Sequence, residues 1–172
     1  ARLTSFRRYA AGIAAALLVG FAGNYAFFAH RLNGWAEQQT VIEAPAGQHV
    51  RISLNDGSEV DLNSGSRLIY PAIFSSKERR VKLVGEARFD VSHNEKQPFV
   101  VETFAYDVQV LGTDFNVIAD EAKGQFSTAL FEGRVSIHNH RNSERIVMEP
   151  NTVVRLENGY LYVDKLESRD EY

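Results

Sequence analysis

The sequence predicts a mostly β protein, in which one N-terminal transmembrane helix is followed by an antiparallel β-domain of the roll or sandwich type. Three observations predict this fold class. An uncharged run, Tyr9 to Ala29, lies near the start of the chain. From Thr40 onward, apolar and polar residues alternate, which is typical of half-buried strands. The pairs Asp56-Gly57 and Asn158-Gly159 are typical of tight turns between antiparallel strands.

The uncharged run has the length of a membrane span. A helix from Tyr9 to Ala29 is about 31 Å long at ~1.5 Å per residue, close to the hydrocarbon thickness of a bilayer. A soluble helix of this length carries a charged face, which this run lacks. A cleaved signal peptide is the rival interpretation, but its apolar region is only about 7–15 residues long and ends in small residues. This run ends in Phe27 and Phe28, so we expect the helix to be retained.

The basic residues around the run predict its orientation. Arg2, Arg7 and Arg8 precede it, whereas only Arg31 follows closely. An excess of cationic residues marks the cytoplasmic end of a membrane helix. We therefore expect the N-terminus in the cytoplasm and the β-domain on the other side of the membrane.

The first β-elements form a predicted hairpin. Residues 50–54 and 60–62 alternate in polarity on either side of the turn 55–58. The next strand, Arg80 to Val91, is interrupted by Gly85, which predicts a bulge or bend. Many short strands joined by tight turns indicate a sandwich, barrel or roll. Further strands are expected at 99–102, 106–111, 115–119, 125–131, 134–139, 145–148, 153–157 and 160–163.

Composition argues against several classes of protein. The chain of 172 residues is 44% hydrophobic and 24% charged, and its formal net charge is -3. Nucleic-acid binding domains are usually basic, so no nucleic-acid partner is expected. The chain has no cysteine, which excludes disulfides and thiolate metal sites. It shows no nucleophile elbow, phosphate loop or catalytic triad pattern. We expect no cofactor and no enzyme that acts on an external substrate.

A metal site is conceivable at His138 and His140. Side chains two apart share one face of a strand, and Glu144 follows, so the spacing is similar to that of cupin metal sites. However, the segment is rich in turn-forming residues. The glycines of a cupin site are also misplaced, because Gly133 is one residue too close and Asn151 stands where the second should be. We therefore expect no bound metal.

Two groups of carboxylates could support acid–base chemistry. Asp56, Glu59 and Asp61 flank the first hairpin, and Glu86 and Asp90 lie in the next strand. Exposed carboxylates of a hairpin are usually solubilising charge, and we expect that role here.

The dipeptide Gly112-Thr113 has two interpretations. Gly112 could end a strand and permit unusual backbone angles. Alternatively, the Thr113 hydroxyl could attack a strained Gly112 carbonyl and convert the peptide bond to an ester, which water would then cut. The residues alone leave both interpretations open.

Taken together, these motifs resemble the periplasmic domain of FecR-like transmembrane anti-sigma factors. The resemblance covers roughly residues 46–160, in the order and spacing of the family pattern, with the membrane helix before it. The matching segments are LNDGSEVDLNSGSRLIYP (Leu54 to Pro71), RVKLVGEARFDV (Arg80 to Val91), PFVVET (Pro98 to Thr103), VQVLGTDFNV (Val108 to Val117) and LFEGRVSI (Leu130 to Ile137).

The resemblance implies a regulator that spans the inner membrane once. In this family, a short cytoplasmic domain holds an extracytoplasmic-function (ECF) sigma factor, and the periplasmic domain receives a signal from an outer-membrane TonB-dependent transducer. Transducer occupancy leads to release or activation of the sigma factor, often through stepwise proteolysis. Related members cut themselves between the Gly and Thr that correspond to Gly112 and Thr113.

The resemblance also gives an expected division of the chain. We expect a cytoplasmic flank at 1–8, the transmembrane helix at 9–29, a linker at 30–45, a periplasmic all-β FecR-like domain at 46–163, and the start of a further C-terminal region at 164–172. The sigma-binding region is expected before Ala1, and a small domain that docks with the transducer is expected after Tyr172.

A binding module is the alternative function. A membrane-tethered periplasmic β-domain could bind a glycan or another cell-wall ligand. Trp35, Tyr70, Phe74 and Phe89 would then supply stacking surfaces, although aromatic residues of β-domains are more often part of the core.

Overall fold

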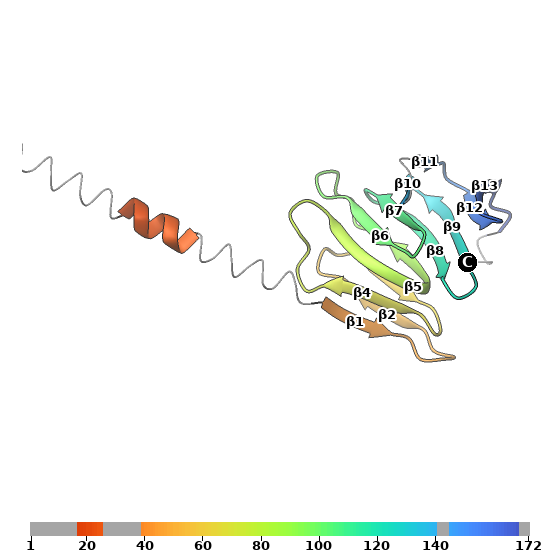
Figure 1. Cartoon of the computed structure of the whole chain (residues 1–172), viewed down its shortest axis with the longest axis horizontal. Coiled ribbons are helices and arrows are strands. Elements are labelled where there is room, and N and C mark those ends of the chain that lie inside the picture. Colours follow the sequence, from red (N-terminus) through yellow and green to blue (C-terminus); the bar gives the residue numbers. More distant parts are fainter. Residues whose placement is uncertain (1–16, 26–38, 141–144, 169–172) are drawn as a thin grey trace, which may run out of the picture. The chain divides into compact units, whose positions relative to one another are not determined.

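The computed structural model describes residues 17–25, 39–140 and 145–168 (Figure 1). The chain divides into two compact units, Ala1–Gln38 and Gln39–Tyr172. In the first unit, residues 17–25 are helical and their apolar side chains are exposed. Within the described ranges, no helix is long and apolar enough to cross a membrane. Most of the predicted helix, Tyr9 to Ala29, lies outside those ranges and stays a prediction.

The second unit is one curled sheet of 13 strands, so the prediction of a mostly β domain is confirmed. The strands are β1 (Gln39–Glu43), β2 (Val50–Ser53), β3 (Glu59–Leu62), β4 (Arg67–Pro71), β5 (Arg79–Asp90), β6 (Phe99–Glu102), β7 (Tyr106–Val110), β8 (Asp114–Asp120), β9 (Gln125–Glu132), β10 (Val135–Asn139), β11 (Arg145–Met148), β12 (Thr152–Glu157) and β13 (Tyr160–Lys165).

Strand β5 belongs to both halves of the curled sheet. Its first residues pair with β4 and β6, which gives the strand order β1-β4-β5-β6-β7-β10-β11. Its last residues pair with β3 and β8, which gives the order β2-β3-β5-β8-β9-β12-β13. The change occurs at Gly85, whose φ is 96°. This left-handed conformation favours glycine and produces the bend that the sequence predicts.

The core lies between the two halves of the sheet. Phe89 stacks on its neighbour Phe115 in the second half, with ring centroids 5.2 Å apart, and also contacts Phe99 of the first half at 6.1 Å. Tyr106 and Phe126 make a second contact between the halves at 4.8 Å. Strands with alternating apolar and polar residues therefore bury one face each against the other half of the curled sheet.

Two features differ from the sequence-based expectation. Strand β1 occupies Gln39–Glu43, inside the expected linker, and pairs with β4 at one edge of the sheet. Edge strands have short and weak apolar patterns, and Pro71 ends β4, so neither strand stands out in the sequence. Strands β5 and β6 pair in parallel, whereas an antiparallel domain was expected. The alternation of apolar and polar residues does not show strand direction, because side chains alternate every two residues in parallel and antiparallel strands alike.

The strands before and after residues 111–113 are interleaved. Strands β1 to β7 precede this connection and β8 to β13 follow it. Strand β8 nevertheless pairs with β5, and β10 pairs with β7. Each half of the sheet therefore contains strands from both parts of the chain.

Candidate functional site

The Gly112-Thr113 dipeptide lies in the connection between β7 and β8. Two backbone hydrogen bonds join Thr113 to Val91, with N–O distances of 3.0 and 3.3 Å. A third, of 2.7 Å, runs from the Asn94 amide to the Leu111 carbonyl oxygen. The dipeptide is therefore fixed against the loop that follows β5, which spans residues 91–98.

Close approach of other chain segments requires glycine at two positions. A Cβ atom at Gly112 would lie only 2.6 Å from the Cα of His93. A Cβ atom at Gly133 would lie 2.8 Å from the Gly112 carbonyl oxygen and 2.9 Å from Thr113 Oγ1. Gly112 is not among the glycines with positive φ. A left-handed backbone is therefore not the reason for glycine at this position, and the close approach of His93 gives a steric reason instead.

The Thr113 side chain is buried beside the bond that it could attack. It is 5% exposed, and its hydroxyl donates to the Arg134 carbonyl oxygen at 3.2 Å. The dipeptide also lines a pocket of about 390 Å³, together with His93, Arg134 and Arg145 among others. Attack by Thr113 Oγ on the preceding carbonyl carbon closes a five-membered ring, and the pocket gives water a route to the product.

The candidate metal residues have separate partners. His138 Nε2 lies 3.0 Å from Ser136 Oγ, and His140 Nε2 lies 2.8 Å from Asp107 Oδ1. Among the described residues, no three His, Asp or Glu side chains are grouped as a metal site requires. Glu144 lies outside the described residues.

The carboxylates of the first hairpin differ in environment. Asp61 pairs with Arg51 at 2.6 Å on the surface, as expected for a solubilising charge. Asp56 is not such a charge, because its side chain is 13% exposed and pairs with the buried Arg79 at 2.7 Å. In β5, Glu86 accepts hydrogen bonds from Asn63 and Asn116.

Sequence reasoning missed Arg79, although a signal was present. Arg79 lies two and four positions before Val81 and Leu83 in β5, so its side chain points to the same inward face. The side chain is 1% exposed. Its guanidinium also donates to the carbonyl oxygens of Ser92 and Gln97, at 2.9 and 2.8 Å. This residue therefore fixes the loop 91–98 that holds Gly112-Thr113.

The aromatic residues proposed as a glycan platform belong largely to the core. Phe89 is fully buried. Phe74 and Tyr70 are partly buried and pack against the core, and the rings of Phe74 and Phe99 are 6.2 Å apart. Trp35 lies outside the described residues. No described member of this group offers the exposed ring face that sugar stacking needs.

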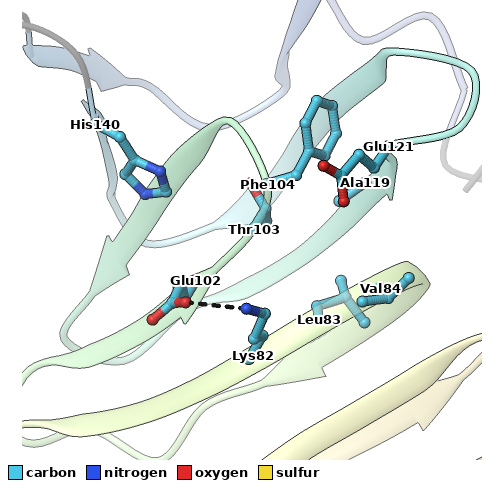
Figure 2. A pocket seen from close by; sticks show the side chains of 9 residues that line it. All are labelled: Lys82, Leu83, Val84, Glu102, Thr103, Phe104, Ala119, Glu121 and His140. Carbon is cyan, nitrogen blue, oxygen red and sulfur yellow. Dashed lines mark ion pairs between the residues drawn. The ribbon is translucent and has the colours of Figure 1, made fainter.

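A second pocket, of about 290 Å³, lies beside β5 and β6 (Figure 2). Lys82 and Glu102 point toward one another across it and pair at 3.5 Å. The neighbouring Arg80 donates hydrogen bonds to Glu78 and Asp107. These hydrogen bonds raise the pKa of Arg80 above its usual value, and the one to Glu78 has the largest effect. These charges are already paired within the protein, so the pocket gives no indication of a ligand.

The comparison with known families identifies the domain. Residues 40–136, more than half of the chain, match the family described as FecR protein. The chain belongs to the FecR protein family. The matched region of this FecR-family chain includes His93, Gly112-Thr113 and Gly133. Proteins of the family are regulators rather than enzymes.

The FecR-family chain is also similar to solved structures. Two crystal structures of a protein from Parabacteroides distasonis, described as a "putative anti-sigma factor", have TM-scores of 0.71 and 0.70 and are 32% and 33% identical. The similarity covers 74% and 73% of this chain, but 60% and 59% of those chains. The chain thus spans about three fifths of the solved protein's length. No curated protein matches it.

Proposed function

We propose that this chain is part of a membrane-spanning anti-sigma regulator, which relays a signal from an outer-membrane TonB-dependent transducer to a cytoplasmic ECF sigma factor. The observation that carries the proposal is the FecR family match over residues 40–136. The likeness to the Parabacteroides protein supports the same role.

The proposed topology is a single pass through the inner membrane, with the β-domain in the periplasm. Its support is the uncharged run from Tyr9 to Ala29 and the basic residues that precede it. In this arrangement the β-domain meets the transducer, and the segment on the other side of the membrane holds the sigma factor.

Co-purification and transcription test the regulatory role. The full-length protein should co-purify with an ECF sigma factor, and deletion of its gene should change transcription from promoters of that sigma factor. The matched control is a protein with the membrane segment and β-domain but without its cytoplasmic segment, which should not retain the sigma factor. Unchanged transcription after deletion would overturn the proposal.

The chain is also proposed to cut itself once at Gly112-Thr113. Thr113 Oγ adds to the Gly112 carbonyl carbon, the bond from that carbon to the Thr113 nitrogen breaks, and the hydroxyl proton passes to the nitrogen. Water then hydrolyses the ester, which leaves a Gly112 carboxyl group and a free Thr113 amine and hydroxyl. The buried Thr113 side chain and the two glycines that surround the bond support this proposal.

Thr113→Ala is expected to abolish this cleavage, because it removes the only oxygen that can form the ester. The wild-type chain should give fragments of 112 and 60 residues on a denaturing gel, whereas Thr113→Ala should give one band. Thr128→Ala is the matched control, since Thr128 is also buried and its hydroxyl also donates to a backbone carbonyl oxygen, at 2.9 Å. This control should still give two fragments. A wild-type chain that stays intact would show that Gly112 serves only the packing of the loop.

A further inference from the structure

The imidazole of His93 lies directly beside Gly112. An ideal Cβ atom on Gly112 would be 2.7 Å from His93 Nδ1. With a Cα–Cβ bond of about 1.5 Å, the distance from Nδ1 to the Gly112 Cα is at most about 4.2 Å. The Gly112 carbonyl carbon is one bond further, which is within reach of the imidazole through one water molecule.

The second ring nitrogen of His93 faces a carboxylate. His93 Nε2 lies 3.8 Å from Glu95 Oε1. Nδ1 lies on the side of Gly112, so in the tautomer that carries its proton on Nε2 it can accept a proton there. Both residues belong to the loop 91–98, and the backbone bonds of this loop to Leu111 and Thr113 hold it in place.

The Thr113 hydroxyl and the His93 imidazole lie beside different neighbours around the dipeptide. Thr113 Oγ1 is directed to the Arg134 carbonyl oxygen and lies beside Gly133. His93 lies instead beside the Gly112 Cα, and its side chain is 68% exposed. Both groups line the same pocket of about 390 Å³. An exposed imidazole in this position can hold and activate a water molecule. Within the described part of the chain, the contact of the Thr113 hydroxyl is with the Arg134 carbonyl oxygen and not with this imidazole.

We propose that His93 is the general base that activates water for hydrolysis of the ester between Gly112 and Thr113. Water adds to the Gly112 carbonyl carbon and gives a proton to His93 Nδ1. The bond from that carbon to Thr113 Oγ then breaks, the leaving oxygen takes a proton from water in the pocket, and His93 gives its proton to solvent. The step consumes one water and leaves His93 unchanged. This inference rests on the proposed self-cleavage and assigns its second step.

His93→Ala tests the proposal in the full chain. The chain is synthesised in a cell-free system, and its two fragments are followed over time on denaturing gels at several pH values. Loss of a general base slows the step by about 100-fold or more, so fragments of His93→Ala should form about 100-fold more slowly than in wild type. Added imidazole should restore part of the rate. His49→Ala, which replaces another exposed histidine, should cleave as wild type does.

Hydroxylamine separates the two steps, because it attacks an ester without a protein base. It should release the 112- and 60-residue fragments from His93→Ala but not from Thr113→Ala. It can also cut at Asn158-Gly159, and those fragments differ in length. Release from His93→Ala also shows that the variant folds well enough to form the ester.

Several outcomes would overturn the assignment. One is a His93→Ala rate and pH profile equal to those of wild type, which would leave self-cleavage standing without this base. Another is a slow His93→Ala that hydroxylamine does not release, which would place His93 in the first step or in folding. A wild-type chain that never cleaves would overturn both the self-cleavage and this role. The charged groups that face His93, and that can influence the pH profile, are Glu95, Arg134 and Arg145.

Discussion

Replacement of Arg79 by alanine is expected to lower the free energy of unfolding by about 3–5 kcal/mol, the usual effect of breaking a buried ion pair from one side. The side chain is 1% exposed and pairs with Asp56, which is itself only 13% exposed. The change leaves this carboxylate with the hydroxyl and amide of Ser58 as its remaining partners. It also removes the donors to Ser92 and Gln97 and a guanidinium contact 5.4 Å from the centre of the Phe99 ring.

Urea unfolding followed by far-ultraviolet circular dichroism measures this effect. The control is Arg51→Ala, which removes an arginine that also pairs with an aspartate, but at the surface, where both side chains are about half exposed or more. Such surface pairs contribute about 0–1 kcal/mol. Equal losses for Arg79→Ala and Arg51→Ala would mean that the buried pair gives no more stability than the exposed one.

Gly85→Ala is expected to destabilise the domain by about 2–6 kcal/mol, the sum of two effects of about 1–3 kcal/mol each. The first is backbone strain, because the φ of 96° is unfavourable for a residue with a Cβ atom. The second is overlap, since that Cβ atom would lie 2.8 Å from the Cβ and 2.9 Å from the Cα of Ser66. The Ser66 hydroxyl, which accepts a hydrogen bond from the Glu86 amide at 2.8 Å, would also be displaced.

Two further variants separate strain from overlap in the same unfolding assay. Gly124→Ala introduces a Cβ atom at a φ of 62°, where no atom lies within 4 Å, so it should show strain alone. Ser66→Gly removes the obstructing side chain. The loss caused by Gly85→Ala should therefore be smaller in a Ser66→Gly background than in wild type. An equal loss in both backgrounds would show that overlap with the Ser66 side chain contributes nothing.

Local signals in the sequence predicted much of this fold. The hairpin of β2 and β3 was predicted because its turn residues and its alternating strands lie within a few positions of each other. The same holds for the turn at Asn158-Gly159, where both φ values are positive, 52° and 83°. The bend at Gly85 was also predicted, since a glycine within an apolar strand indicates a bulge or bend.

Long-range features could not be read in the same way. The parallel pairing of β5 with β6 and the edge pairing of β1 with β4 depend on chain direction and on distant partners. In the candidate site, Gly112-Thr113 was found as a dipeptide and through a family resemblance. His93 was missed because no spacing rule links it to Gly112, from which it is separated by two strands and their turns. Only folding brings the two residues together.

The interleaved strands have a mechanical consequence if the chain is cut at Gly112-Thr113. The two pieces would not fall apart, because β8 stays paired with β5 along six residue pairs and β10 stays paired with β7 along five. A pull between the two ends of the molecule would then be resisted by hydrogen bonds and core packing instead of by a covalent backbone. Under tension an uncut chain can only unfold, whereas a cut chain can dissociate into two separate pieces. After a cut, the paired strands would therefore form a non-covalent connection that force can open.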